Sequence, residues 1–382
     1  MSDQKSGDHS NDNLIGQNKS ELSTPSLCLD LNIFEANLQK MSEHVKRSRI
    51  GLRPHAKSHK CPQIALRQVN SGALGVCAAT IDEAEAMSRA GVNGILITSE
   101  MVGRHKIDRL VALTSAAPDT MSVVDSPVHV DELEQAASAA GVRPGVLIDM
   151  DLGLKRTGVA TVDAGVSLAE KICATSTLQL RGVSAYSSLS AHVAGFEERR
   201  AHSLKAMEPA VELMSRLRRA GMPAEILSGG STGTYNIDPE IEGMTELQAG
   251  SYIFMDVDYH LIGGKTSAAF DDFGFSLTVI ATVISKSHDG VATVDAGFKA
   301  LATDRPFGPE LKGRPGVKYH FGGDEHGILE IRDGEDNLRV GDRLEFFVPH
   351  CDPTVNLYDR IHCIRNDRIE AVWGIARGYQ NG

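Results

Sequence analysis

Short apolar runs alternate with amphipathic stretches from about Leu52 to Phe254. Runs of this length, flanked by glycine and polar residues, are typical of strands buried on both faces of a parallel sheet. The predicted strands are 50–54, 75–79, 95–98, 121–124, 145–148, 182–186, 224–227 and 247–253. The predicted helices between them include 81–90, 126–140, 164–175 and 196–220. Eight strands that are each followed by a helix predict an α/β fold with a parallel (β/α)8 barrel.

The pattern changes after about Phe270, where helical stretches become rare. The strands expected there are 275–285, 291–295, 329–332, 343–348 and 361–364. Turn residues separate them, which predicts a mostly antiparallel second domain. An early strand at 26–30 would fit the same sheet, so the two chain ends would meet there. We therefore expect a disordered polar tail over 1–23, a barrel over 24–269 and a C-terminal β domain over 270–382.

Composition narrows the class of protein. The chain has 382 residues, enough for a large core, and 39 basic against 50 acidic side chains give a net charge of −11. That charge makes a nucleic-acid or anionic-membrane partner improbable. No apolar run reaches the roughly 18 residues of a membrane helix, and the polar start of the chain lacks the apolar stretch of a signal peptide. The six cysteines show no paired spacing, which fits reduced residues of a cytoplasmic enzyme.

Polar side chains gather where the predicted barrel strands end, the edge at which barrels carry their active sites. Lys57 follows the first strand within the cationic run Arg53–Lys60, and an amine in such surroundings can lose its proton and form an imine with a carbonyl cofactor. The bland alternative is a solvated basic loop. Small residues follow the seventh strand and occur within the eighth, where barrels commonly bind phosphate. The polar residues at the other strand ends are Asp149, Asp151, Arg156 and Tyr186.

A second candidate site is the run His350-Cys351-Asp352 near the C-terminus. If this run is extended, His350 and Asp352 point to one side and Cys351 to the other, because side chains alternate along a strand. Imidazole with carboxylate suits a hard ion such as Mn²⁺ or Mg²⁺. Pro353 would keep the next turn extended. Two alternatives remain: zinc bound by Cys351 and His350, and a turn with an incidental histidine.

These motifs, in this order, resemble the fold-type III pyridoxal-phosphate enzymes, and within them the metal-activated D-threonine aldolase and D-serine dehydratase group. The resemblance runs from about Thr24 to the C-terminus. It implies an alanine racemase-like barrel, pyridoxal 5'-phosphate as cofactor and a divalent metal. It identifies Lys57 as the lysine that holds the cofactor, with Lys60 as its rival in the same segment. It places Arg156 beside the cofactor's phenolic oxygen and Tyr186 near its pyridine nitrogen. The residues that resemble the phosphate cup are Ser231, Thr232, Gly233, Gly250 and Ser251.

The same resemblance gives His192 the role of taking the proton from the substrate's β-hydroxyl, and His350 and Asp352 the role of metal ligands. A neutral tyrosine at the pyridine nitrogen makes the cofactor a weaker electron sink, so a metal at the hydroxyl could carry more of the activation. At this place the dehydratases of the group have a His-x-Cys motif. This chain has His-x-Asp, as the aldolases of the group do. The segments at Asp324–Gly327 and Asp295–Lys299 also resemble group motifs of uncertain role.

The resemblance therefore predicts cleavage of D-threonine or a related D-3-hydroxy amino acid into glycine and an aldehyde. D-3-Hydroxyaspartate aldolase, D-serine or D-3-hydroxyaspartate dehydratase, and racemase remain alternatives, as does a protein that only carries the cofactor. One departure affects the substrate pocket: family members often have His-Gly or Gln-Gly after the tyrosine, where this chain has Ser187 and Ser188. Fold-type III relatives are usually dimers, so a homodimer is expected.

Overall fold

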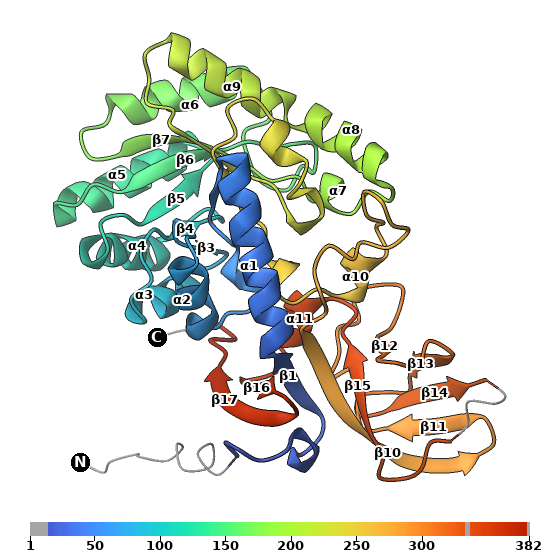
Figure 1. The fold of residues 1–382 in the computed structure, drawn as a ribbon. Coiled ribbons are helices and arrows are strands. Elements are labelled where there is room, and N and C mark those ends of the chain that lie inside the picture. The colour runs from blue at the N-terminus through green and yellow to red at the C-terminus, as the bar shows by residue number, and fades with distance from the viewer. Residues whose placement is uncertain (1–13, 333–336, 380–382) are drawn as a thin grey trace, which may run out of the picture. The chain divides into compact units, whose positions relative to one another are not determined.

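The computed structural model describes residues 14–332 and 337–379, and the chain divides into two units (Figure 1). The described residues of the first, called here the barrel unit, are Leu38–Tyr252, Tyr259–Asp272 and 378–379. Those of the second, the β unit, are 14–37, Ile253–Asp258, 273–332 and 337–377. Helix α1 (Leu31–Ser48) carries the chain from the β unit into the barrel unit.

The barrel unit contains a sheet of eight parallel strands, as predicted, in the order β2-β9-β8-β7-β6-β5-β4-β3. A parallel bridge between His55 and Cys77, and the hydrogen bond from Cys77 N to Pro54 O of 2.9 Å, join the chain after β2 to β3 and close the ring. The strands are β2 (Gly51–Leu52), β3 (Cys77–Ala78), β4 (Leu96–Ile97), β5 (Met121–Val124), β6 (Gly145–Asp149), β7 (Gln179–Ala185), β8 (Ile226–Gly229) and β9 (Glu246–Leu247).

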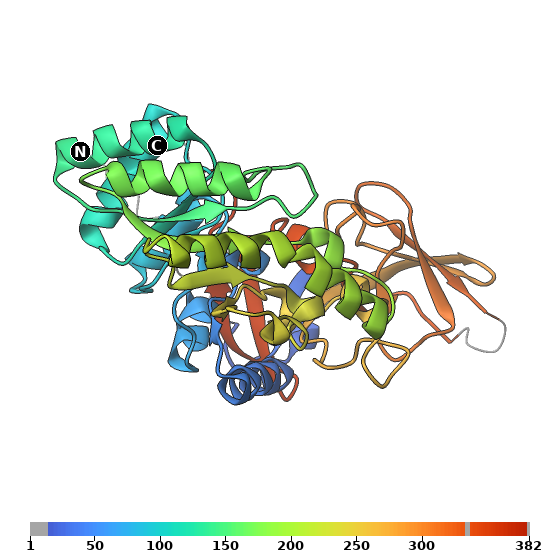
Figure 2. The same cartoon turned by 90° about the horizontal axis from the view of Figure 1, so that it is seen from above.

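Helices cover the outside of these strands (Figure 1), and α6 packs beside α9 (Figure 2). Several begin at a side chain that accepts a backbone N–H, such as Thr80 for α3 and Thr161 for α6, which stabilises the first turn. The longer helices are α2 (Pro62–Asn70), α3 (Ile81–Arg89), α4 (Arg104–Ala116), α5 (Pro127–Ala140), α6 (Val162–Ala174), α8 (Phe196–Ala206) and α9 (Glu208–Arg219). The single-turn helices are η2 (Ala56–Ser58), α7 (Ser188–Ala191), η3 (Thr232–Thr234), η4 (Asp238–Glu240), η5 (Ser251–Ile253) and α10 (Val257–His260).

The prediction of one helix over 196–220 was wrong, because α8 ends at Ala206 and α9 begins at Glu208, with Met207 as a turn between them. Pro209 lies in the first turn of α9, where a missing N–H costs nothing, but the same ring would clash with the preceding turn of a continuous helix. Two shorter helices therefore replace the long one.

Alternate residues of the barrel strands enter two separate apolar clusters. Leu96, Met121 and Leu147 pack together in one cluster. Their neighbours Ile97 and Ile148 belong to a larger one that includes residues of the surrounding helices. Since side chains alternate across a strand, the small cluster fills the barrel's interior and the large one joins the barrel to its helices. The barrel is thus packed inside with apolar side chains.

The β unit is mostly antiparallel, as predicted, with a main strand order of β13-β14-β11-β10-β1-β16-β17; β15 pairs with β10 and β12. Strand β1 pairs antiparallel with β10 and parallel with β16, which confirms that the early strand joins the C-terminal sheet. The elements are η1 (Lys19–Glu21), β1 (Ser26–Asp30), β10 (Leu277–His288), β11 (Val291–Val294), β12 (Glu310–Leu311), β13 (Val317–Phe321), β14 (Gly327–Ile331), β15 (Arg343–Phe347), α11 (Cys351–Val355), β16 (Arg360–Arg365) and β17 (Arg368–Gly374).

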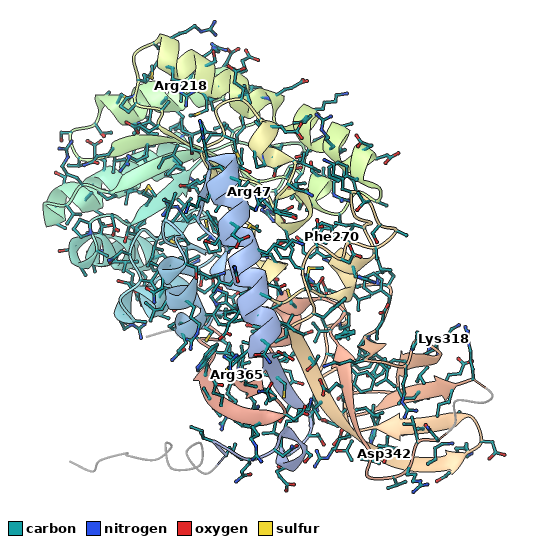
Figure 3. The ribbon with its side chains drawn as sticks, viewed as in Figure 1. Arg47, Arg218, Phe270, Lys318, Asp342 and Arg365 are labelled. Atoms are coloured by element: carbon teal, nitrogen blue, oxygen red, sulfur yellow. The ribbon has the colours of Figure 1, made fainter. Side chains whose placement is uncertain are left out.

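Strands β12, β13 and β17 were not predicted. Strand β17 follows β16 after a two-residue turn in which Asn366 and Asp367 have φ values of 50° and 62°. Arg365, labelled in Figure 3, ends β16 and forms ion pairs with Glu35 and Glu370, each at 2.6 Å. Two left-handed residues between alternating runs are a hairpin signal, so β17 could have been found in the sequence.

The predicted disordered tail over 1–23 is too long. Residues 1–13 lie outside the described part of the chain, but residues 14–23 form turns and η1. Asn18 forms an isolated antiparallel bridge with Arg368, and Lys19 forms an ion pair with Asp367 at 2.8 Å and another with Glu345. These contacts with the C-terminal hairpin fix the segment that polar composition alone suggested was loose.

Candidate active site

A cavity of about 400 Å³ opens at the carboxyl ends of the barrel strands. It brings together seven residues that the sequence assigned to cofactor binding, from β2, β6, β7, β8 and β9 or the loops that follow them. Because every strand is parallel, all these ends meet on one face of the barrel. The seven residues are Lys57, Arg156, Tyr186, Ser231, Thr232, Gly250 and Ser251.

Lys57 lies in η2, the turn that follows β2. His55 caps this turn: its Nδ1 accepts the N–H of Lys57 at 3.3 Å, and its Nε2 lies 3.0 Å from Thr98 Oγ1. Gly250 packs against the same turn, since a Cβ on it would lie 2.6 Å from His55 O. The backbone that carries Lys57 is thus held from two other strand ends, those of β4 and β9.

Lys60, the rival lysine, is not among the residues that line the described cavity. Its Nζ lies 3.5 Å from Glu83 Oε1, and Glu83 accepts the N–H of Ala79 at 2.7 Å. This arrangement is typical of a charged residue with a structural role near the start of a helix. Lys57, in contrast, lines the cavity.

Arg156 lies in the loop that joins β6 to α6. A parallel bridge between Met150 and Val159 closes the base of this loop, and Asp149 Oδ2 accepts from Thr157 Oγ1 at 2.9 Å. The Cζ atom of Arg156 lies 5.9 Å from the ring centroid of Tyr186, within the range of a cation–π contact. The loop thus places the arginine beside the tyrosine, as the proposed cofactor roles require.

The four cup residues that line the cavity come from two short segments, after β8 and after β9. Thr232 is 1% exposed, and its Oγ1 has no hydrogen-bond partner among the described residues. A buried hydroxyl without a partner is costly in a folded protein unless something else binds it. A phosphate oxygen would supply the missing partner, so the residues fit the phosphate of pyridoxal phosphate. Gly233, the fifth predicted member, is buried outside the cavity lining, and its carbonyl accepts from Arg199 Nε at 2.7 Å.

His192 is likewise absent from the residues that line the described cavity. It caps the C-terminus of α7, and its ring lies on that of Tyr259, with centroids 4.5 Å apart. Tyr259 itself lines the cavity. The structure thus places His192 one ring behind the wall, not at its surface.

Two carboxyl groups at the cavity wall were not assigned a role. Glu100 follows β4 and Asp149 ends β6; burial and the neighbouring Glu100 raise the pKa of Asp149 to about 7. Burial also raises the pKa of Glu100. The negative charge of each carboxyl disfavours ionisation of the other, so a proton is retained on the pair to higher pH than on an isolated carboxyl. Asp149 was noted at a strand end in the sequence, but only the fold brings Glu100 to it.

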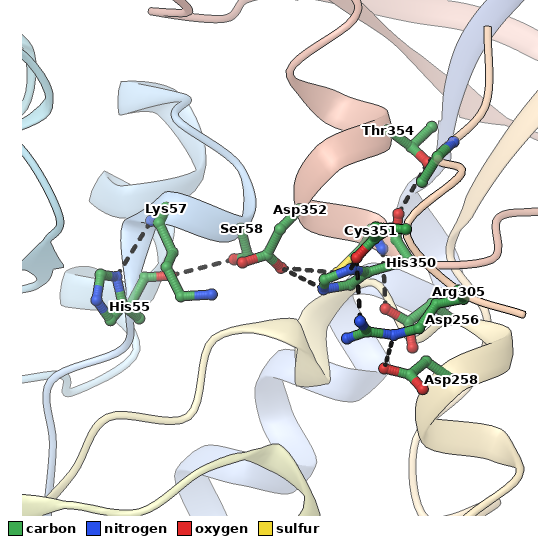
Figure 4. Close-up of polar contacts among 12 residues, drawn as sticks. His55, Lys57, Ser58, Asp256, Asp258, Arg305, His350, Cys351, Asp352 and Thr354 are labelled. Atoms are coloured by element: carbon green, nitrogen blue, oxygen red, sulfur yellow. Dashed lines mark hydrogen bonds and ion pairs between the residues drawn. The ribbon is translucent and has the colours of Figure 1, made fainter. Parts of the chain in front are cut away.

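The predicted metal ligands lie in the β unit, at the start of α11 (Figure 4). The expectation of a strand there was wrong: His350 is the residue before the helix and Asp352 lies within its first turn. Pro353 fits because a first-turn residue needs no N–H. Cys351 does not point away from Asp352, since its Sγ lies 3.3 Å from Asp352 Oδ2.

His350 and Asp352 nevertheless face each other, with 3.9 Å between Nε2 and Oδ2. The other ring nitrogen, Nδ1, lies 2.8 Å from Asp304 Oδ2. Arg305 donates to Asp304 at 3.1 Å. It also donates to Asp258 at 2.7 Å, a contact that Figure 4 shows. A carboxylate on one imidazole nitrogen directs the lone pair of the other toward a ligand site, as in many metal centres.

No group of three or more metal-ligating side chains occurs among the residues the structure describes. The donor pair has the imidazole and carboxylate chemistry of a Mn²⁺ or Mg²⁺ site, so it fits an ion whose remaining ligands are water or substrate. Within the same described residues, no helix is long and apolar enough to cross a membrane.

Comparisons with known proteins agree with this geometry. The model for the alanine racemase N-terminal domain matches residues 29–258, and that for a putative serine dehydratase domain matches 276–364. The chain is 36% identical over 369 residues to 3-hydroxy-D-aspartate aldolase of Paracoccus denitrificans, covering 96% of this chain and 95% of that protein. It is 36% identical over 366 residues to D-threonine aldolase of Arthrobacter sp., covering 95% of each.

A solved structure, D-threonine aldolase from Filomicrobium marinum, superposes with a TM-score of 0.91 at 35% identity, covering 95% of this chain and 97% of that one. The match thus spans both units of the fold as well as both candidate sites. The chain belongs to the fold-type III pyridoxal-phosphate enzymes, in the group that contains the D-threonine aldolases and D-serine dehydratases.

Proposed function

We propose that this chain is an aldolase, dependent on pyridoxal phosphate and a divalent metal, that cleaves D-threonine and related D-3-hydroxy amino acids into glycine and an aldehyde. The observation that carries the proposal is the cavity at the strand ends, which gathers Lys57, Arg156 and Tyr186. The near-full-length similarity to a 3-hydroxy-D-aspartate aldolase and a D-threonine aldolase supports the same reaction class.

The cofactor would be held by Lys57, with Arg156 and Tyr186 at its ring and Ser231, Thr232, Gly250 and Ser251 at its phosphate. When bound, it supplies an electron sink for the pair left at Cα. The His55 cap and the Gly250 contact hold the Lys57 turn in place, and the closed loop base does the same for Arg156. These contacts fix the groups before substrate enters, which lowers the entropic cost of reaction.

His350 and Asp352 would hold the metal, which supplies a Lewis acid for the substrate's β-hydroxyl. Asp304 accepts from His350 Nδ1 and so keeps the Nε2 lone pair available. His192 would take the hydroxyl proton; because its ring lies behind that of Tyr259, we propose that a water molecule carries the proton to it. The Cα–Cβ bond then breaks, the aldehyde leaves, and a proton added at Cα gives glycine. The dehydratases of the group have a cysteine at the position of Asp352. Because aspartate is the harder ligand, Asp352 favours cleavage over dehydration.

D-3-Hydroxyaspartate is the second candidate substrate, because one relative is named for it. Its additional carboxylate would need a cation. Among the residues that line the described cavity there is one lysine, Lys57, and one arginine, Arg156. Both are proposed to bind the cofactor. Glu100 and Asp149 on the wall would repel a second carboxylate when ionised. These charges favour an uncharged side chain such as that of threonine.

We further propose a homodimer, by analogy with fold-type III enzymes, with the barrel and β domains divided near residue 270.

The six cysteines, all within the described residues, form no disulfide. That fits a reducing compartment, so we propose the cytoplasm. Light scattering of the purified protein gives the mass of the assembly.

The test is incubation of the full chain with pyridoxal phosphate, Mn²⁺ and either D- or L-threonine, with D-3-hydroxyaspartate in parallel. We expect glycine and acetaldehyde in equal amounts from D-threonine, and no product from the L-enantiomer. Ammonia and 2-oxobutyrate from D-threonine would replace the aldolase with a dehydratase. Glycine from D-3-hydroxyaspartate alone would retain the reaction and change the substrate.

A further inference from the structure

A carboxyl group that forms no ion pair with any residue the structure describes is buried next to the predicted phosphate cup. Asp238 begins η4 and is 2% exposed. Its Oδ1 accepts from Ser203 Oγ at 2.6 Å and its Oδ2 bonds Thr234 Oγ1 at 2.5 Å. Burial raises the pKa of Asp238 to about 6. A buried carboxylate is normally matched by a cation or several N–H donors, so this arrangement calls for an explanation.

The hydrogen bonds continue from Asp238 toward the cavity. Thr234 Oγ1 lies 3.0 Å from Ser231 Oγ and also accepts the N–H of Ser231 at 3.1 Å. Ser231 lines the cavity, whereas Thr234 is buried behind it. Gly230 leaves room for this relay, since its φ is +79° and a Cβ on it would lie 2.5 Å from Asp238 Oδ2. The relay therefore runs Asp238, Thr234, Ser231, cavity.

The protonation state of Asp238 decides which way the hydroxyls of this relay point, because each hydroxyl has a single proton. If Asp238 is ionised, Thr234 must donate to it, and Ser231 then donates to Thr234. The lone pairs of Ser231 are left toward the cavity, where they repel an anion. If Asp238 is neutral, it donates to Thr234, Thr234 donates to Ser231, and the proton of Ser231 is available to an anion.

We propose that Asp238 is a positioning residue that couples uptake of one proton to binding of the cofactor's phosphate, through the hydroxyls of Thr234 and Ser231. The inference rests on the proposed phosphate cup but not on the substrate or the metal. The balance is simple: the phosphate enters, Asp238 Oδ2 gains a proton from solvent, and the two hydroxyl protons reverse direction without any other bond being made or broken.

Other titratable groups lie near Asp238 but are bonded elsewhere. On α8, Arg199 donates to the carbonyls of Gly233 and Gly263, and His202 Nδ1 lies 2.9 Å from Ser190 Oγ. Arg200 pairs with Glu240 of η4 at 2.5 Å. Among the described residues none of these forms an ion pair with Asp238. The carboxyl is thus free to change charge in response to the cup.

The sign of the coupling follows from linkage. Binding of phosphate raises the pKa of Asp238, so affinity is greatest where Asp238 is already neutral and falls as the pH rises through about 6. Above that pH the affinity should fall by up to about tenfold per pH unit relative to a protein in which the group cannot ionise. Asp238→Asn is that protein, because its amide can donate to Thr234 while its carbonyl accepts from Ser203.

The experiment is calorimetric titration of the cofactor-free full chain with pyridoxal phosphate at pH 7.5, in buffers of different ionisation enthalpy. We expect the native protein to take up as much as one proton more than Asp238→Asn. The same difference should appear with inorganic phosphate and vanish with pyridoxal, which lacks the phosphate. Because the ligand's own titration is common to both proteins, the difference isolates Asp238.

Two further variants keep the test decisive if Asp238→Asn folds poorly. Thr234→Val breaks the relay and should abolish the additional uptake. Ser203→Ala removes the hydrogen bond outside the relay, so the uptake should persist and move to higher pH. Equal proton uptake by native protein and Asp238→Asn, or a difference that persists with pyridoxal, would overturn the inference. Failure of pyridoxal phosphate to bind at all would instead overturn the proposed cofactor site.

Discussion

The two candidate sites are built in opposite ways. In the barrel unit, the groups around the cavity come from strand ends far apart in the chain, from Lys57 to Ser251. In the β unit, His350 and Asp352 are near neighbours at one helix start, and Asp304, Arg305 and Asp258 follow one another as a chain of contacts. The first site is assembled by topology and the second by local geometry and a serial network.

The two sites should therefore respond differently to single substitutions. A side chain at its own strand end can be changed with little effect on those at other strand ends, so substitutions of cavity residues that do not contact one another should act separately. A serial network transmits the loss of any member to the metal ligand at its end. Single substitutions around the cavity should therefore have different effects, whereas those in the β unit should all lower metal affinity.

The largest expected effect in the barrel is that of Lys57. We expect Lys57→Ala to lower kcat by about 10³-fold or more, since the variant loses both the imine and an amine that transfers protons. Borohydride reduction of the native holoenzyme should fix the cofactor on the peptide that contains Lys57. Lys60→Gln is the matched control, because Lys60 pairs with Glu83 at 3.5 Å instead; cofactor attached to Lys60 would reverse the assignment.

In the β unit the sharpest substitution is Asp304→Ala, which removes the acceptor from His350 Nδ1. We expect metal affinity to fall by about 10- to 100-fold, as is usual when a carboxylate behind a ligating histidine is lost. Titration of the metal-free protein with Mn²⁺, followed by electron spin resonance of the free ion, measures it. Asp359→Ala is the control, since Asp359 pairs with its neighbour Arg360; an equal loss there would contradict the network.

Thr232 tests the phosphate cup alone. Thr232→Val replaces the buried hydroxyl that has no partner among the described residues with a methyl group of similar size. We expect affinity for pyridoxal phosphate to fall by about tenfold or more, because a hydrogen bond to a charged group contributes about 1.5–3 kcal/mol. Affinity for pyridoxal, followed by absorbance, should be unchanged. A tighter-binding variant would show that the hydroxyl does not face the phosphate.

The last expected effect concerns stability instead of activity or binding. The pKa of Asp149 rises from 3.8 to about 7 in the folded chain, so the folded state binds more protons than the unfolded state between these values. The contribution of this group is present below about pH 4 and is lost as the pH rises toward 7. Asp149→Asn should therefore flatten the fall in unfolding free energy over that window, measured by urea denaturation. Asp163→Asn, on the exposed face of α6, should leave the slope as it is.

The sequence was sufficient for the barrel strands, because parallel strands buried on both faces form apolar runs that stand out. It was insufficient where the outcome depends on neighbours distant in the chain. Asp238 and Glu100 are ordinary acidic residues until the fold buries one under a glycine turn and brings the other to Asp149.

For His350 and Asp352 the predicted backbone conformation was wrong, although the two side chains do lie together. His350 and Asp352 do face each other, but across the start of a helix instead of along a strand. Pro353 was read as an extended residue, although proline also fits the first helical turn. Strands β13 and β17 had alternating apolar and polar residues and could have been predicted, whereas the contact of Asp304 with His350 could not.

The most direct test of the central claim follows D-threonine, labelled with ¹³C at Cα, by NMR in the holoenzyme before and after chelation. We expect label in glycine, loss of that signal with the chelator, and its return when Mn²⁺ is added to the native protein but not to His350→Ala. Label in 2-oxobutyrate, or glycine formed at an undiminished rate after chelation, would contradict it.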